Sequence, residues 1–292
     1  APLLFNVFIN DIYKALTNEF LMFADDLKIY ARVVSTADQL NLQHSLMNIV
    51  KWCKENAMEL NISKCRVVSF TRRAVTFNFD YHVEGVLLAR ADSIKDLGVI
   101  FTSSLNPIDH ITSVTSRAYS LLGFVFRSTR HFTTPRPLLI LFNSIIRPVL
   151  EYGSVIWTPY QLGHIEKLNR VQIRFMRLLG VRLGYTYLEA PIAELELQFN
   201  VQSLHHRRMV SDLLFLYKLV NGMLDCSELL DMITFNIPRG TRSTNVFGRR
   251  FQPTSYALNS GMSRLQRLGD ELAAGVDVFY ESLHVFRRRL LA

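Results

Sequence analysis

The apolar and polar positions at the start of the chain change from helical to extended spacing. Apolar residues recurring at intervals of three and four predict a helix over residues 3–16. Two β-prone runs follow, residues 20–24 and 27–34, and the acids Asp25 and Asp26 lie between them. This order predicts a β-hairpin whose turn carries two carboxylates.

The next segment carries a helix start signal and then further strands. Ser35 opens an S-x-x-D sequence, and the apolar face that follows predicts a helix ending near Asn56. Extended runs are predicted at residues 66–71, at the alternating positions 77–83 before a turn at Glu84-Gly85, and at residues 94–101.

After Pro107 the spacing becomes helical. The apolar faces predict helices over residues 111–125, 138–149, 165–179 and 204–220, and a final short helix over 277–291. Residues 237–260 show no clear period and are rich in Arg, Ser, Thr, Asn, Gly and Pro, which predicts a long loop. The fold class expected is therefore α+β to about residue 105, followed by a mostly helical part.

Composition adds a basic charge to this outline. The 292 residues are 49% hydrophobic and 20% charged, which argues against global disorder, and the net charge of +8 makes a polyanionic partner plausible. The cysteines Cys53, Cys65 and Cys226 lack zinc-site spacing and favour a reduced, intracellular protein. Residues 138–157 are apolar but carry charged residues and Pro148, so they predict a buried helix rather than a membrane span.

Two adjacent carboxylates at a hairpin tip repel each other unless a cation neutralises them. Hard oxygen ligands suit Mg²⁺, and two such ions can stabilise the attacking and leaving oxygens of a phosphoryl transfer. A solvated turn is the simpler alternative, since Asp is common in turns. Asp25 and Asp26 alone favour that simpler interpretation.

The flanking residues favour the metal site. L21-M-F-A-D-D-L-K-I-Y30 resembles the acid hairpin of reverse transcriptases, and P2-L-L-F-N-V-F-I-N-D-I12 resembles the helix that follows the family's glycine-containing template-and-nucleotide motif. Further reverse transcriptase segments follow in the family's order: W52-x-x-x-N56 and L60-N-I-S-K64 resemble the helix and strand after the acid hairpin, and L97-G-V-I-F101 resembles the primer grip. Three later segments are similar to those of insect LINE elements of the jockey type: R147–W157, I165–Q172 and H206–G222.

The resemblance implies that Asp25 and Asp26 are catalytic and are two of three palm carboxylates that bind Mg²⁺, with Mn²⁺ as an alternative. It places the third carboxylate upstream of residue 1, together with the fingers and the endonuclease domain, so the chain is expected to be a piece of a longer protein. Asp11, the other acid nearby, is expected to be a polar residue at a helix end. Residues 1–292 alone are expected not to polymerise.

The same resemblance assigns roles to other residues. Leu97, Gly98 and Val99 fall in the strand pair called the primer grip, where Gly98 would allow close approach of the primer end or mark a strand bulge. Lys64 corresponds to a segment in which a lysine can donate a proton to departing pyrophosphate, and a solvated strand end is the alternative.

A row of basic residues follows one side of the third predicted helix. Its members are Lys167, Arg170, Arg174 and Arg177. Such a row can track a phosphate backbone, or it can be a solvated face, and the sequence leaves both open. The clusters at 72–73, 249–250 and 287–289 are expected to be largely solvated, His205 and His206 are not expected to bind metal, and both tryptophans are expected in cores.

The resemblance implies three regions: a partial palm over 1–105, a helical thumb over 106–185 and a helical C-terminal region over 186–292. The implied partners are an RNA template, a DNA primer or target and dNTPs, with no membrane, in nucleus and cytoplasm. A different class also fits: a non-catalytic RNA- or DNA-binding protein derived from a retroelement. A degenerate fragment with no retained role is the third alternative.

Overall fold

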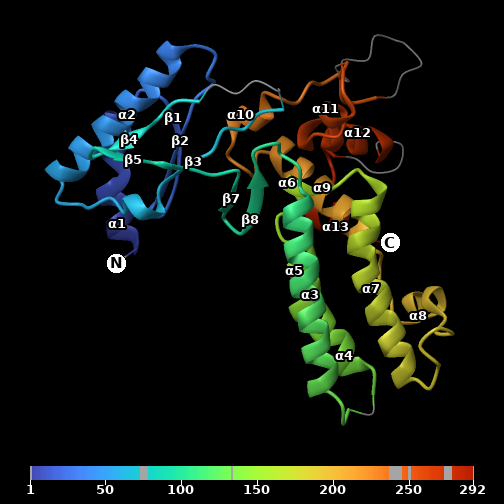
Figure 1. Ribbon diagram of the computed structural model, residues 1–292. Helices are drawn as coiled ribbons and strands as arrows, with labels where there is room; N and C mark the ends of the chain where they lie inside the picture. Colours follow the sequence, from blue (N-terminus) through green and yellow to red (C-terminus); the bar gives the residue numbers. More distant parts are fainter. Residues whose placement is uncertain are drawn as a thin grey trace. The chain divides into compact units, whose positions relative to one another are not determined.

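The computed structural model describes residues 2–72, 78–132, 134–236, 245–248, 251–272 and 278–291. The chain divides into two compact units, residues 1–106 and 107–292 (Figure 1). The first unit mixes helices and short strands, and the second consists of helices with one isolated β-bridge in its described part. The mixed helix and strand content agrees with the predicted α+β class.

The first unit opens with α1 (Pro2–Ile9), which tightens into the 3₁₀ helix η1 (Asn10–Ala15). The hairpin strands β1 (Glu19–Phe23) and β2 (Asp26–Tyr30) follow, as predicted, although β2 ends before the predicted run does. Helix α2 (Thr36–Glu55) begins and ends where its sequence signals placed it. Its N-terminus is a capping box, in which the Ser35 hydroxyl accepts from the Asp38 amide and the Asp38 carboxylate accepts from the Ser35 amide.

Short strands complete this unit. They are β3 (Arg66–Val67), β4 (His82–Val83), β5 (Val86–Leu87), β6 (Ala89–Arg90), β7 (Ser93–Asp96) and β8 (Val99–Thr102), preceded by the 3₁₀ turn η2 (Ile62–Lys64). The described strands form four separate two-stranded sheets: β1–β2, β3–β6, β4–β5 and β7–β8. The predicted strand 66–71 shrinks to two residues, and Phe77, at the start of the predicted alternating run, lies outside the described residues.

Residues 94–101 form a hairpin, so the prediction of one continuous strand there was wrong. Leu97 (φ 43°) and Gly98 (φ 88°) both adopt left-handed backbone, and Asp96 pairs with Val99 across the turn. Positive φ at both central residues is the geometry of a type I′ turn, whose twist matches that of the strands it joins. Gly98 is therefore a turn residue rather than a bulge.

The core of the first unit forms on α2. One face packs Ile49, Trp52 and Cys53 against Ile9 and Ile12, with Met22, Leu27 and Ile29 of the hairpin around them. A second cluster, built on Tyr81, Val83 and Leu88, packs against Leu42, Leu46 and Val50 of the same helix. Trp52 is 7% exposed, as its prediction as a core residue required.

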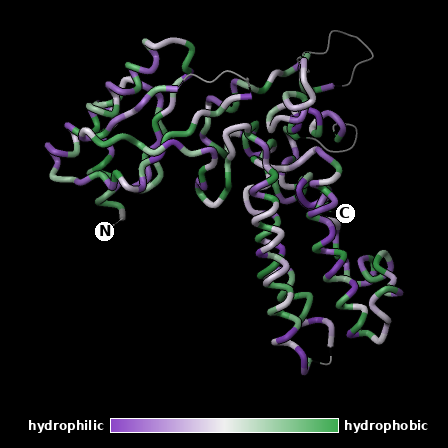
Figure 2. The backbone as a smooth tube through the Cα atoms, in the orientation of Figure 1, coloured by the Kyte–Doolittle hydropathy of each residue, from purple (hydrophilic) through white to green (hydrophobic). Residues whose placement is uncertain are grey.

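The second unit is built on three long helices: α3 (Ile108–Ser128), α7 (Leu162–Arg182) and α9 (Leu204–Val220). Shorter helices are α4 (Arg136–Leu141), α5 (Arg147–Glu151), α6 (Ser154–Trp157), α8 (Ile192–Gln198), α10 (Ser227–Leu230), α11 (Ser255–Leu258), α12 (Gly261–Leu272) and α13 (Leu283–Leu291). Hydrophobic and hydrophilic residues mix along α3 and α7, as expected of helices with one buried side (Figure 2). In the described part of the chain, no helix is long and apolar enough to span a bilayer.

The predicted helix 138–149 is irregular. Between α4 and α5 the backbone widens into the π-helical segment η3 (Phe142–Ile146). Pro148, the second residue of α5, has no N–H for the carbonyl of Ser144, so a regular helix would lose a hydrogen bond and meet the proline ring there. The wider π turn accommodates the proline without ending the helical path.

A buried ion pair ties the middle of α9 to α12. The Asp212 carboxylate accepts from Arg264 Nε at 2.8 Å and from Nη2 at 3.2 Å, and Nη2 also donates to the Val155 carbonyl. Both side chains are nearly inaccessible, at 2% and 9% exposed. Burial raises the pKa of Asp212, and the guanidinium of Arg264 opposes that rise.

The C-terminal part departs from the sequence prediction. Helix α12 was not predicted, and α11 lies within the segment expected to be a loop, of which residues 237–244 and 249–250 are outside the described residues. Phe247 forms an isolated β-bridge with Phe235. Its ring packs closely on Gly269, where an added Cβ atom would lie 2.5 Å from the ring. The final helix begins at Leu283, and Asp277, where it was expected to begin, is not described.

Candidate functional site

The two acids occupy the tip of the β1–β2 hairpin. Phe23 pairs with Asp26 as the last register pair, which leaves Ala24 and Asp25 as the turn. Ala24 has φ 53°, the left-handed conformation that a tight two-residue turn requires. Both Asp25 and Asp26 are exposed, so water solvates the two carboxylates and neither carries a desolvation cost.

The two faces of this hairpin differ in their surroundings. Met22, Leu27 and Ile29 turn toward the core around Trp52. Because strand side chains alternate, Asp26 and Lys28 share the opposite face, and cross-strand partners lie on the same face. That face also carries Leu21 and Phe23, which are 58% and 60% exposed, so it is open within the unit.

The predicted primer-grip residues occupy a second hairpin tip. Leu97 and Gly98 form the exposed turn between β7 and β8, where a ligand could approach their backbone. Val99 is 3% exposed, so its side chain belongs to the core rather than to a contact surface. Leu97 and Gly98 are therefore accessible to a ligand, whereas the side chain of Val99 is not.

An ion pair joins the two hairpins. Lys28 Nζ of β2 lies 2.5 Å from Asp96 Oδ1 of β7, and both side chains are partly buried. Asp96 is the residue immediately before the Leu97-Gly98 turn, and Lys28 lies two positions beyond Asp26. The side chains of Lys28 and Asp96 thus connect the two hairpins, and the sequence analysis singled out neither residue. The spacing of two between Asp26 and Lys28 did indicate that both lie on the same face of the strand.

Lys64 ends the short 3₁₀ turn η2 and is exposed. No ion pair or hydrogen bond joins its side chain to Asp25 or Asp26 among the residues that the structure describes. Its role stays a prediction.

The tip of the β1–β2 hairpin offers two carboxylates, Asp25 and Asp26, as metal ligands. In the described part of the chain, no group of three His, Cys, Asp or Glu side chains is placed to hold a metal ion. Two exposed carboxylates with open space around them do suit a Mg²⁺ ion that keeps water or phosphate ligands. The described residues therefore fit part of a metal site.

The basic row on α7 divides into two columns. Lys167 and Arg174 are seven residues apart and project toward α3, where Lys167 donates to the Thr112 hydroxyl and Arg174 lies 5.5 Å from the centre of the Tyr119 ring. The other column, about 60° around the helix at 3.6 residues per turn, holds Arg170 and Arg177.

The second column also has contacts within the chain. Arg170 pairs with Glu166 at 3.6 Å, and Arg177 lies over the Tyr187 ring at 5.4 Å. Arg170 and Arg174 are exposed, whereas Lys167 and Arg177 are half-buried. The face is thus cationic but partly engaged, and its two exposed guanidinium groups are the ones available to a ligand.

Helices α3 and α7 run parallel. Lys167 meets Thr112, Arg174 meets Tyr119, and Arg182 donates to the Phe126 carbonyl, so contacts recur at a separation of 55 or 56 residues. An open depression of about 490 Å³ lies between the helices. Its lining includes Tyr119, Ser120, Gly123, Arg127, Arg174 and Leu178. The sequence analysis missed Arg127. This residue lies on α3, and only the packing of α3 against α7 brings it near Arg174.

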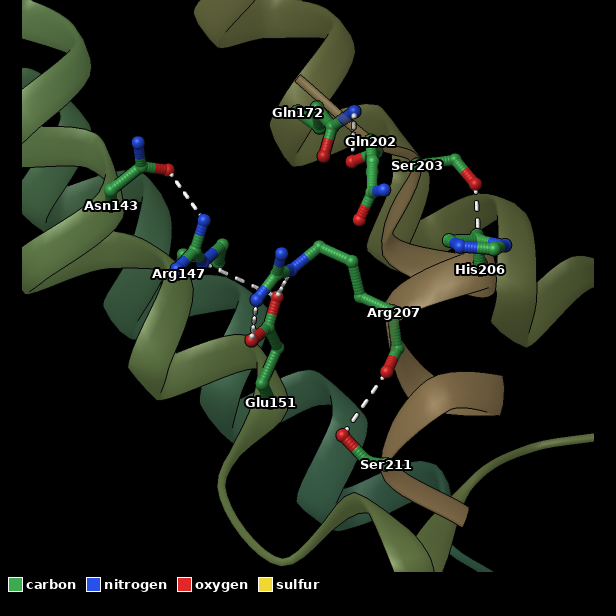
Figure 3. Close-up of polar contacts among 9 residues, drawn as sticks. All are labelled: Asn143, Arg147, Glu151, Gln172, Gln202, Ser203, His206, Arg207 and Ser211. Atoms are coloured by element: carbon green, nitrogen blue, oxygen red, sulfur yellow. Dashed lines mark hydrogen bonds and ion pairs between the residues drawn. The ribbon is translucent and has the colours of Figure 1, made fainter. Parts of the chain in front are cut away.

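A network of charged residues packs α5 against α9 (Figure 3). Arg207 donates to both carboxylate oxygens of Glu151, and Arg147 lies beside Glu151 while donating to Asn143. Arg208 is 1% exposed, and its guanidinium has no hydrogen-bond partner among the described residues. Burial lowers the pKa of Arg208 to about 10, while the carboxylates of Glu151 and Asp212 oppose that shift.

The adjacent histidines at the start of α9 have separate surroundings. His206 Nε2 donates to the Leu290 carbonyl at the end of α13. The pKa of His205 is lowered, mainly by burial and also by Arg208 and His206. The three cysteines are free thiols.

Comparison with known proteins adds a family match. Residues 1–124 match the family model described as reverse transcriptase (RNA-dependent DNA polymerase). This matched segment includes both hairpin tips and most of α3. No solved structure matches the chain.

Three curated proteins illustrate the similarity. The chain is 24% identical over 191 residues to the "Probable RNA-directed DNA polymerase from transposon BS" of Drosophila melanogaster, covering 61% of this chain and 21% of that protein. It is 25% identical over 160 residues to the corresponding protein from transposon X-element of the same organism, covering 54% and 18%. A transposon-derived protein of Caenorhabditis elegans is 26% identical over 174 residues, covering 58% and 59%. The chain thus spans about a fifth of the two Drosophila relatives.

Proposed function

We propose that the chain is part of an RNA-directed DNA polymerase of the type carried by LINE-like transposons, because residues 1–124 match the reverse transcriptase family and the similar Drosophila proteins are transposon polymerases by name. The observation that carries the proposal is the exposed pair Asp25 and Asp26 at a hairpin tip. In this proposal residues 1–105 are the end of the palm, 106–185 the thumb and 186–292 a C-terminal region.

The residues of the two tips and Lys64 each have a task in the proposed reaction. Asp25 and Asp26 hold Mg²⁺, and Mn²⁺ could substitute. The bound metal supplies charge neutralisation for nucleotidyl transfer. The backbone of Leu97 and Gly98 orients the primer end, and Lys64 donates a proton to the leaving pyrophosphate. The partners are an RNA template, a DNA primer or target and dNTPs.

Metal binding tests the acid pair directly. We expect residues 1–292 to bind Mn²⁺, and we expect Asp25→Asn together with Asp26→Asn to abolish this binding, because neutral amides are weaker ligands for a hard cation. Electron paramagnetic resonance of free Mn²⁺ measures it. The matched control is Asp11→Asn, an exposed acid in the same unit, which should bind as the wild type does. If the double variant bound Mn²⁺ as well as the wild type does, Asp25 and Asp26 would not be metal ligands.

The catalytic part of the proposal has its own test. With two carboxylates of the expected three among the described residues, we expect no template-dependent primer extension by residues 1–292 with Mg²⁺ or Mn²⁺. A longer chain that supplies a third carboxylate should extend the primer, and Asp26→Asn in it should not. Extension by residues 1–292 alone would contradict the need for a third ligand.

The face of α7 should contribute to nucleic-acid binding. Changing Arg170 and Arg174 to Glu should flatten the dependence of log K on log salt by about 1.8, because each neutralised phosphate of duplex DNA contributes about 0.9. Fluorescence anisotropy with a labelled DNA duplex at several salt concentrations measures the slope. The matched control reverses two exposed arginines on α13, Arg287 and Arg288. An equal change in both variants would indicate a general charge effect rather than a binding face.

The depression between α3 and α7 favours a second candidate, a non-catalytic RNA- or DNA-binding protein derived from a retroelement. Its supporting observation is that Arg127 and Arg174 line one open groove with Tyr119. The two candidates differ in one measurement. In the second, binding of nucleic acid is independent of divalent metal and unchanged by Asp25→Asn with Asp26→Asn.

A further inference from the structure

The two hairpin tips of the first unit lack a shared sheet. Strands β1 and β2 form one two-stranded sheet, and β7 and β8 form another. A backbone ladder fixes strands within each hairpin, but none runs between these two sheets. Side-chain contacts between the two hairpins therefore help to set their relative position.

The ion pair between Lys28 and Asp96 acts at this junction. The nitrogen–oxygen distance is 2.5 Å, and the side chains are 33% and 28% exposed, so solvent screens the pair incompletely. The two residues are 68 positions apart in the sequence, so the pair joins distant segments rather than neighbours on one element.

Lys28 and Asp96 each lie within two residues of a hairpin tip. Lys28 is two residues from Asp26 on the same face of β2, a rise of about 7 Å along a strand. Asp96 pairs with Val99 and directly precedes the exposed Leu97-Gly98 turn. A displacement of either strand at the ion pair is thus passed to a tip within one or two residues.

We propose that Lys28 and Asp96 are positioning residues that hold the acid tip at a fixed place relative to the Leu97-Gly98 turn. This rests on the proposed function, in which one tip binds the metal and the other orients the primer end. Reaction between a primer end and a metal-bound nucleotide requires that separation to be fixed, because small misplacements slow a transfer that depends on positioning. The pair contacts no reacting group itself.

Paramagnetic broadening by Mn²⁺ measures the separation without requiring polymerase activity. The chain has 13 glycines, so ¹⁵N-glycine labelling gives a simple amide spectrum, and the first unit contributes Gly85 and Gly98. We expect Mn²⁺ to broaden the Gly98 signal in the wild type. Lys28→Ala and Asp96→Ala should each lose much of that broadening, and the exchange Lys28→Asp with Asp96→Lys should restore it.

The matched control is Lys95→Ala, which removes an exposed positive charge from β7 but leaves the ion pair intact. Its Gly98 broadening should equal that of the wild type, and the position of the Gly85 signal reports that every variant is folded. Equal broadening of Gly98 in Lys28→Ala, Asp96→Ala and the wild type would overturn the positioning role alone. Absence of broadening in the wild type would instead count against the metal site, and so against the proposed function as well as this inference.

Discussion

Replacing Arg264 by Met is expected to lower the free energy of unfolding of the second unit by about 3–5 kcal/mol, the usual cost of breaking a buried ion pair from one side. The substitution leaves the Asp212 carboxylate buried without the two hydrogen bonds that Arg264 donates to it. It also removes the donor to the Val155 carbonyl, which ties α12 to α6. Methionine keeps a similar volume, so the effect reports the lost charge rather than a cavity.

The loss should depend on pH in a defined direction. The folded-state pKa of Asp212 is already raised above its ordinary value by burial, and Arg264 opposes that rise. Without Arg264 the pKa rises further. An acid whose folded pKa is raised loses stability as the pH increases from its ordinary pKa through the folded value. The difference between variant and wild type should therefore be largest at neutral pH and shrink as the pH falls and Asp212 becomes protonated.

Urea denaturation followed by tryptophan fluorescence measures this loss. Trp157 belongs to the second unit and Trp52 to the first, so a Trp52→Phe background isolates the second unit's transition. The control is Arg267→Met on the same helix, which gives up a single 3.3 Å hydrogen bond to Asn259 and should cost far less. Adding Asp212→Asn to Arg264→Met should recover part of the loss, and a loss that is independent of pH would contradict the role assigned to the Asp212 charge.

The Phe175→Ala variant should also lose about 3–5 kcal/mol, the range for deleting a fully buried phenylalanine. Phe175 is 0% exposed, and its ring stacks on Phe142 with centroids 4.0 Å apart and meets Phe126 edge-on at 6.1 Å. The side chain thus joins α7 to the π-helical segment and to α3.

The same fluorescence assay checks this prediction, with Phe124→Ala as the control. Phe124 lies on α3 but is 57% exposed, so its removal should change the unfolding free energy by less than about 1 kcal/mol. Equal losses in the two variants would mean that the packing of Phe175 against Phe142 and Phe126 contributes little.

Local signals in the sequence were sufficient for several elements. The S-x-x-D capping box, the acid pair between two β-prone runs, and the helical spacing of α3, α7 and α9 each depend on residues a few positions apart. Such features are dictated by backbone geometry and by which face of a helix or strand is apolar. The resemblance to reverse transcriptases depends on the same short segments, and the family match over residues 1–124 confirms it.

The prediction of one strand over residues 94–101 failed for a local reason, because Leu97 and Gly98 adopt left-handed backbone and fold the run into a hairpin. Other predictions failed where a neighbour distant in sequence decided the outcome. Helix α12 has apolar residues at helical spacing, Met262, Leu265, Leu268 and Leu272, but its position is fixed by the Arg264–Asp212 pair and by packing of Phe247 on Gly269. Nothing near these residues in the sequence identifies the partner.

The sequence by itself determined the resemblance to reverse transcriptases, the acid hairpin and the order of the main helices, because these follow from short-range periodicity and motif residues. The tertiary structure alone decided which charges meet. It placed Lys28 against Asp96, set α3 parallel to α7 so that Arg127 and Arg174 share a groove, and buried Val99. Those contacts join residues tens of positions apart, and their geometry depends on how whole elements pack, which no local pattern specifies.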